Sequence, residues 1–154
     1  SEQLADIAVS AAKSCREFLG AEPVVALLSF STRGSGGKDE NVLRVQEAVS
    51  LLKERKPDFI FDGEMQLDAA LVPSVTEKKA PGSPVAGKVN TLVFPDLGAG
   101  NIGYKLVQRL GCADAYGPFL QGFACPISDL SRGCTVDDIV TTSAVTLVQA
   151  GKKT

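Results

Sequence analysis

The sequence contains no histidine among its 154 residues. Catalytic sets of the Ser-His-Asp or Cys-His type therefore cannot be assembled from this chain alone. Any general base must be a carboxylate, a lysine or a thiolate. The cysteines stand at positions 15, 112, 125 and 134, and no pair has CxxC spacing. Without histidine, this spacing argues against an ordinary zinc site, so we predict no bound metal.

The cysteines have mostly apolar neighbours, which favours reduced thiols in a cytoplasm, although their number alone does not exclude disulfides. No cationic residue adjoins Cys125 or Cys134 in sequence. We therefore expect both to be packing residues rather than nucleophiles.

No apolar run is long enough to cross a bilayer, and the net charge is only −2. Neither a membrane nor a nucleic acid is therefore predicted as a partner. The acidic start, Ser-Glu-Gln, does not fit a signal peptide, and we expect a cytoplasmic location. With 44% hydrophobic and 22% charged residues, the composition is that of a globular domain. The length alone predicts a single domain.

Helical and strand-like patterns alternate along the chain. Helical spacing of apolar residues predicts helices over 4–18, 42–52, 67–80 and 139–148, with a loop and then a helix over 98–110. Pro73 weakens the third of these predictions. Strands are predicted at 24–30, 59–61, 91–94, 113–116 and 123–127. The repeated order of strand, loop and helix indicates an α/β fold: three layers, with helices on both faces of a parallel or mixed sheet.

Ligands of such sheets bind beyond the carboxyl ends of the strands, so the loops that follow the strands are candidate sites. These loops are 31–38, 62–66, 95–105 and 117–122, and we expect them near residues 129–138. Ser31, Thr32, Gly34 and Ser35 supply hydroxyls and backbone N–H groups before a helix, which is typical of an anion cradle. A flexible loop has the same pattern, and the nucleotide motifs GxxxxGK[ST] and GxGxxG are absent.

A second candidate lies at 98–105, where Asn101, Tyr104 and Lys105 follow glycines that permit close backbone approach.

Residues 129–138 are the most informative segment. Thr135 is suited to cap a helix, and Asp137 and Asp138 would fall in its first turn, where acids suit the helix dipole. An ordinary capping box explains these positions equally well. Capping does not explain Ser131 and Arg132, which suit a bound oxyanion.

Several segments carry a resemblance to a known family. They are Leu28-Ser-Phe-Ser-Thr-Arg-Gly-Ser35, Asp62-Gly-Glu-Met-Gln-Leu-Asp-Ala-Ala70, Ser83-Pro-Val-Ala-Gly87, Phe94-Pro-Asp-Leu-Gly-Ala-Gly-Asn-Ile-Gly-Tyr-Lys105, Gly117-Pro-Phe-Leu-Gln-Gly122, Asp129-Leu-Ser-Arg-Gly133 and Asp138-Ile-Val140. Together and in this order, they resemble the carboxyl-terminal half of the phosphate acetyltransferases (phosphotransacetylases). The resemblance covers nearly the whole chain.

The resemblance implies a fold like that of the isocitrate/isopropylmalate dehydrogenases, with a cleft between two α/β domains, in a homodimer. Residues 1–118 would form most of the second domain, and residues 119–154 would return to the first with the Ser-Arg-Gly…Asp-Asp motif. The implied activity transfers an acetyl group between acetyl phosphate and coenzyme A. Coenzyme A is a substrate there, and no cofactor is tightly bound.

The resemblance also implies roles for single residues. Asp138 would be the general base, Ser131 would orient the thiol, and Arg132 would hold the phosphoryl oxygens. The implied substrate-binding residues are Asn101, Tyr104, Lys105, Ser31, Thr32, Gly34, Ser35 and Gln121.

The chain departs from the family pattern in two ways. It has Pro126-Ile-Ser-Asp129 where the family usually has Pro-Val-Asn-Asp, and it lacks the family's amino-terminal half. We therefore expect this chain alone to be incomplete, with the missing half as its partner.

Three alternatives stay open from the sequence. A phosphate butyryl- or propionyltransferase would share the motifs, and so would a non-catalytic regulatory domain with this fold. A metal-dependent decarboxylating dehydrogenase would need clustered aspartates and a nicotinamide site that the sequence does not show.

Overall fold

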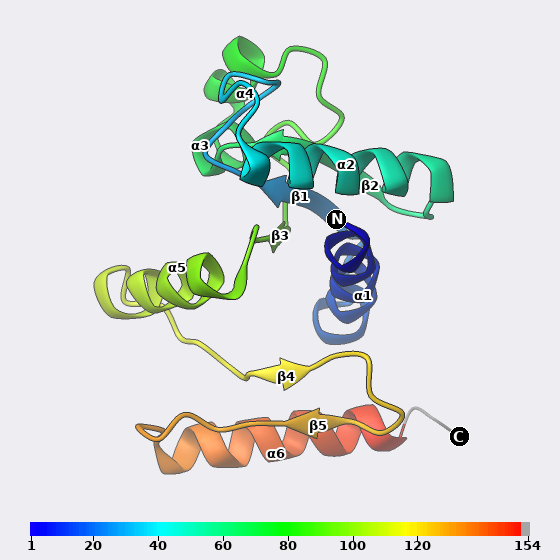
Figure 1. Ribbon diagram of the computed structural model, residues 1–154. Coiled ribbons are helices and arrows are strands. Elements are labelled where there is room, and N and C mark those ends of the chain that lie inside the picture. Colours follow the sequence, from blue (N-terminus) through cyan, green and yellow to red (C-terminus); the bar gives the residue numbers. More distant parts are fainter. Residues whose placement is uncertain (152–154) are drawn as a thin grey trace. The chain divides into compact units, whose positions relative to one another are not determined.

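The computed structural model describes residues 1–151, and the chain divides into two compact units (Figure 1). Unit 1 is Ser1–Asn101, and unit 2 begins at Ile102. The chain therefore does not share one core, contrary to the expectation from its length.

Unit 1 is a three-layer α/β structure. Its strands β1 (Val24–Leu28), β2 (Ile60–Met65) and β3 (Thr91–Val93) form a parallel sheet in the order β2-β1-β3. Helices α1 (Glu2–Leu19) and α2 (Glu40–Arg55) pack on one face. Helices α3 (Leu67–Leu71) and α4 (Pro73–Lys79) pack on the other. This confirms the predicted α/β class, and the predicted helix over 67–80 is broken at Pro73.

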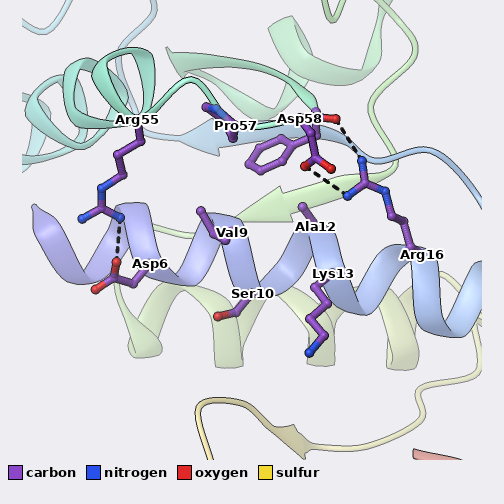
Figure 2. Close-up of a pocket in the computed structure, with 10 residues that line it drawn as sticks. Asp6, Val9, Ser10, Ala12, Lys13, Arg16, Arg55, Pro57 and Asp58 are labelled. Carbon is purple, nitrogen blue, oxygen red and sulfur yellow. Dashed lines mark hydrogen bonds and ion pairs between the residues drawn. The ribbon is translucent and has the colours of Figure 1, made fainter. Parts of the chain in front are cut away.

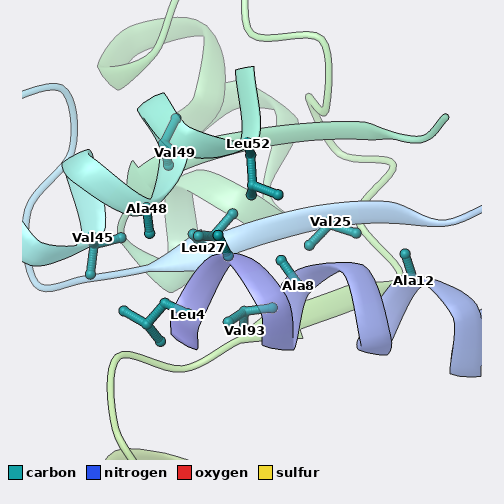
Figure 3. Packing of buried hydrophobic residues seen from close by; sticks show 11 residues of the cluster. Leu4, Ala8, Ala12, Val25, Leu27, Val45, Ala48, Val49, Leu52 and Val93 are labelled. Carbon is teal, nitrogen blue, oxygen red and sulfur yellow. The ribbon is translucent and has the colours of Figure 1, made fainter. Parts of the chain in front are cut away.

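Strand β1 is buried on both faces because successive side chains of a strand point to opposite sides. Val25 and Leu27 join a cluster with residues of α1 and α2 (Figure 3). Ala26 and Leu28 join a second cluster with residues of α3 and of the segment that follows α4. Residues 24–30 form a near-continuous apolar run in the sequence because side chains on both faces of this strand are buried.

The ends of the helices follow local chemistry. Gly20 ends α1 with φ 60°, a left-handed conformation that glycine adopts without strain. The side chain of Asp39 accepts the backbone N–H of Asn41 and caps α2. Helix α5 (Leu97–Leu110) begins earlier than predicted, because the Asp96 carboxylate accepts the N–H of Ala99 at 2.8 Å. Residues 98–105 are therefore helix, not the predicted loop.

Strand β2 runs past the predicted end of its strand. Residues 62–65, predicted as a loop, continue the pairing with β1 up to Met65. The register shifts between Leu27 and Leu28, so Glu64 is an extra, bulged residue. A bulge changes the direction in which the side chain of the extra residue points, while the strand remains paired on either side of it.

Unit 2 contains most of α5, the strands β4 (Phe119–Leu120) and β5 (Ile127–Ser128), and α6 (Val136–Gly151). Strands β4 and β5 are antiparallel. No strand forms at the predicted 113–116, β4 lies in a predicted loop, and β5 begins only at the end of the predicted 123–127. Short apolar runs do not show which residues will find a hydrogen-bonded partner strand.

Unit 2 has almost no interior of its own. Among its described residues only Thr142 is buried, whereas apolar side chains of α5 and α6 are exposed. The most exposed of these within unit 2 are Leu110, Val136, Leu147, Ile102 and Val140. Large exposed apolar sets of this kind mark surfaces that another part of a protein covers.

The cysteines only partly follow the prediction. All four are free thiols, as expected, and Cys15 is buried. Cys125 is exposed and Cys134 is partly exposed, so Cys125 is not a packing residue. The prediction failed because the unit in which Cys125 lies has little core to pack into.

The packing of α2 gives a matched test of the core. Leu52 is fully buried, whereas Leu43 on the same helix is 45% exposed. In a full-length protein that carries this chain, Leu52→Ala should destabilise by about 2–5 kcal/mol, because it leaves a cavity. Leu43→Ala should cost less than about 1 kcal/mol. Urea unfolding measures both, and equal losses would contradict this account of the core.

Candidate functional site

The segment that leads into α6 is a complete capping box. The Thr135 hydroxyl accepts the backbone N–H of Asp138 at 3.2 Å. In return, Oδ2 of Asp138 accepts the backbone N–H of Thr135 at 2.8 Å. The structural role that the sequence allowed for these residues is therefore confirmed.

The two residues upstream lie in the turn before this helix. The Ser131 hydroxyl accepts the N–H of Gly133 at 3.3 Å, and the Ser131 carbonyl accepts the N–H of Cys134. Arg132 is exposed, and its guanidinium has no ion pair or hydrogen bond to any residue that the structure describes. Its five N–H donors therefore remain available for an anion.

The pKa of Asp138 is lowered from its ordinary value of 3.8. The largest cause is the N–H of Thr135, followed by the hydrogen bond with the Thr135 side chain; the charge of Arg109 adds to both, and desolvation opposes them. Hydrogen bonds to a carboxylate favour its charged form. Asp138 is therefore an anion at neutral pH.

Three predicted substrate-binding residues lie on α5. Asn101, Tyr104 and Lys105 are three and four positions apart, which places them on one side of the helix. All three are exposed, and Nζ of Lys105 lies 5.0 Å from the centre of the Tyr104 ring. Gln121 follows β4 and is exposed too.

The predicted anion cradle lies at the carboxyl end of β1, where Ser31 and Thr32 are buried. The Ser31 hydroxyl donates to Oε1 of Glu64 at 2.7 Å, and the N–H of Gly34 donates to the same oxygen at 2.8 Å. The Ser35 hydroxyl accepts the N–H of Thr32. These groups thus bind one another and Glu64, and their role in substrate binding stays a prediction.

Several buried polar residues around this loop were not among the predicted site residues. Asp62 and Glu64 are 5% and 3% exposed, and Ser83 is buried beside Asp62. Two acids inside a short buried strand were the available signal, because such residues are rarely buried without partners. In unit 1 the loop after β1 and the last residues of β2 therefore lie together, as expected for this edge. That residues 117–122 and 129–138 approach this edge stays a prediction.

A groove of about 650 Å³ lies between α1 and the segment that leads into β2 (Figure 2). Two ion pairs cross it, Arg55 with Asp6 at 2.6 Å and Arg16 with Asp58 at 3.2 Å. None of the residues predicted to bind substrate lines this groove, and its guanidinium groups are already paired.

Within residues 1–151 no three His, Cys, Asp or Glu side chains gather in a way that could hold a metal ion. No described helix has both the length and the apolar composition needed to cross a membrane.

Comparison with known proteins identifies the family of this chain. The chain belongs to the family described as phosphate acetyl/butaryl transferase, whose model matches residues 1–147. A phosphate acetyltransferase of Treponema pallidum is 76% identical over 97% of this chain and 45% of its own length. The chain thus spans about half the length of the curated relatives it matches.

Solved structures agree with this family. A phosphotransacetylase from Streptococcus pyogenes has a TM-score of 0.91 at 49% identity, covering 99% of this chain and 46% of its own. The EutD phosphotransacetylase from Staphylococcus aureus has a TM-score of 0.85 at 55% identity, covering 96% of this chain and 45% of its own.

The capping box makes the ionisation of Asp138 testable. In a full-length protein that carries this chain, the carboxyl group should titrate below 3.8, by ¹³C NMR of its side chain. The stabilisation of α6 from the charged form is then complete above that ordinary value and is lost as pH falls through the lower folded pKa. Thr135→Ala should move the midpoint back toward 3.8. A midpoint at or above 3.8 in the unmodified protein would contradict the hydrogen-bonded geometry.

Proposed function

We propose that this chain, together with the part of its relatives that it does not span, transfers an acetyl group between acetyl phosphate and coenzyme A. The observation that carries the proposal is the 76% identity to a phosphate acetyltransferase over 97% of this chain. Ser131, Arg132 and Asp138 are supporting features, because they supply a hydroxyl, a free guanidinium and a carboxylate within eight positions.

In the proposed reaction, the sulfur of coenzyme A attacks the carbonyl carbon of acetyl phosphate. A C–S bond forms, the C–O bond to phosphate breaks, and inorganic phosphate leaves with the bonding electrons. The thiol proton passes to a base. Phosphate is a good leaving group, so the chemistry requires neither a covalent enzyme intermediate nor a metal.

Asp138 fits the base only if proton transfer accompanies attack. A free thiol has a pKa of about 8.5 and an ordinary aspartate about 4, a difference of ~4 to 5 units. The hydrogen bonds of Thr135 lower the pKa of Asp138 and widen this difference. A separate step that forms a free thiolate is therefore disfavoured. Oδ1, which does not accept the backbone N–H of Thr135, would accept the proton as the C–S bond forms.

Arg132 and Ser131 supply the other groups that the reaction needs. A guanidinium with free N–H donors can bind two phosphoryl oxygens at once and stabilise the charge on the departing phosphate. The Ser131 hydroxyl, one turn before α6, would orient the thiol. Asn101, Tyr104 and Lys105 of α5 would contact the phosphate end of the substrate, and we propose substrate contacts for Ser31, Thr32, Gly34, Ser35 and Gln121 as well.

The organisation of the whole enzyme is part of the proposal. We propose a cytoplasmic homodimer in which residues 1–118 form most of one α/β domain and residues 119–154 return to the other. Coenzyme A would be a dissociable substrate. The exposed apolar side chains of unit 2 support this arrangement, because they need a covering surface.

Two alternatives remain distinct. The family description includes butyryl transfer, and a series of acyl phosphates of increasing chain length would measure the preference. A non-catalytic domain of the same fold would form no thioester from acetyl phosphate and coenzyme A.

A direct assay tests the proposed activity. Acetyl phosphate and coenzyme A are mixed, and thioester absorbance is followed with a full-length enzyme that carries this chain and with the 154 residues alone. The full-length enzyme should be active and the chain alone nearly inactive, since substrate positioning can contribute ~7–11 kcal/mol to a barrier. No thioester with the full-length enzyme would refute the function, and full activity of the chain alone would refute its incompleteness.

The two roles of Asp138 can be separated by a pair of variants. Asp138→Asn retains an oxygen for the N–H of Thr135 but cannot take a thiol proton. It should lower kcat by about 10²–10⁴-fold with little change in KM for acetyl phosphate. Thr135→Ala removes the cap and leaves the carboxylate, so its kcat should fall by less than about fivefold. Similar losses in both variants would mean that Asp138 only caps α6.

A further inference from the structure

Three of the segments that carry the family resemblance, 28–35, 62–70 and 83–87, lie together at the carboxyl end of β1. Ser83 donates a hydrogen bond to Oδ2 of Asp62. The same oxygen accepts Nη2 of Arg33 at 2.8 Å, and the N–H of Gly63 donates to Oδ1. Asp62 therefore binds the 31–37 loop and the 83–87 segment together. A buried carboxylate with partners on both oxygens holds its partners in one geometry.

Glu64 fills the cradle of the same loop. Its Oε1 accepts Ser31 and Gly34, and its Oε2 accepts Nε2 of Gln46 at 3.1 Å. The bulge in β2 places this carboxylate where a cradle of hydroxyls and N–H groups would otherwise receive an outside anion. Ser31 and Gly34 already donate to this internal carboxylate, so a substrate phosphate at the loop would need a further donor.

Arg33 is the group that the loop turns outward. Its side chain is 44% exposed, whereas the side chain of Asp62 is 6% exposed. Its backbone has φ 52°, a left-handed conformation that costs a non-glycine residue free energy. The loop maintains that conformation through the hydrogen bonds to Glu64. One N–H of the guanidinium donates to Asp62, and its other donors have no partner among residues 1–151.

Two cationic side chains lie at one cavity beside the loop. This shallow cavity of about 310 Å³ is lined by Arg33 and Lys53 together with residues of the loop, of α2 and of β2. Lys53 is exposed, and no ion pair involves it within residues 1–151. Glu64 also lines the cavity, but both of its carboxylate oxygens accept hydrogen bonds from the protein, and Asp62 does not line it. A ligand would therefore meet two cations and one carboxylate whose oxygens already have donors. Parallel sheets bind ligands beyond this edge.

We propose that Arg33 binds a phosphate group of a substrate and that Asp62 positions its guanidinium. The proposal rests on the proposed function, which supplies two sources of that chemistry: acetyl phosphate and the phosphates of coenzyme A. Arg33 contacts the ligand, whereas Asp62 and Ser83 act through it.

Kinetics of Arg33→Gln in the full-length enzyme test the contact. KM for the substrate that carries the contacted phosphate should rise about tenfold or more, because a charge-assisted hydrogen bond is lost, and kcat should stay within about threefold. A rise for acetyl phosphate alone identifies its phosphoryl group. A rise for coenzyme A that is absent with dephospho-coenzyme A identifies the 3′-phosphate, and a rise with both identifies the pyrophosphate.

The positioning role has its own readout. Asp62→Asn should raise the same KM by a smaller factor, and the double variant Arg33→Gln/Asp62→Asn should be no worse than Arg33→Gln alone. Arg55→Gln is the matched control, because Arg55 is also an exposed arginine held by one aspartate. Its KM values should stay within about twofold of the unmodified enzyme.

Unchanged KM values in Arg33→Gln, or a rise equal to that in Arg55→Gln, would overturn the proposal. A joint fall of kcat and rise of both KM values would do so too, since it indicates a disordered loop. If the unmodified enzyme forms no thioester, the proposed function fails separately. Calorimetric titration with coenzyme A and with inorganic phosphate then decides: weaker binding by Arg33→Gln than by the unmodified protein supports the contact, and equal binding overturns it.

Discussion

Unit 1 depends on one strand that is buried on both faces. Val25 and Leu27 pack under α1 and α2, and Ala26 and Leu28 pack against the opposite layer. Strand β1 also pairs with β2 on one side and with β3 on the other. Because neither face of this strand is exposed to solvent, polar residues can follow only beyond its end, where the chain leaves the sheet. The 31–37 loop therefore lies where the family-like segments converge, and its geometry is set by the core beneath it.

The sequence predicted this unit well because its signals are local and periodic. The apolar run at 24–30, the helical spacing around α1 and α2, and Gly20 each report on a neighbouring part of the chain. The strands of unit 2 were predicted poorly, since β4 and β5 have two residues each and so show no periodicity. Asp96 shows the same limit at one residue: its capping bond extends α5 over a segment whose glycines indicated a loop.

The candidate site was predictable in composition but not in bonding. Thr135 and Asp138 had to be helix-capping residues, catalytic residues or both, and spacing alone could not choose. The structure shows that Oδ2 of the carboxylate caps the helix. In the proposed reaction, capping would also hold the carboxylate beside the Ser131–Arg132 turn in its ionised form. A carboxylate of lowered pKa is a weak base, so the proposed proton transfer would accompany the attack of sulfur.

The 31–37 loop shows why a pattern of hydroxyls and glycines cannot by itself identify an anion site. Such a loop needs a negative charge, and the sequence does not say whether a substrate or the protein supplies it. Here Glu64 supplies it from a bulged position that no periodicity predicts. An internal carboxylate cannot diffuse away, so the loop is ordered before any substrate binds. That order is what allows Arg33 to keep an unfavourable backbone conformation at an exposed position, with Asp62 to aim it.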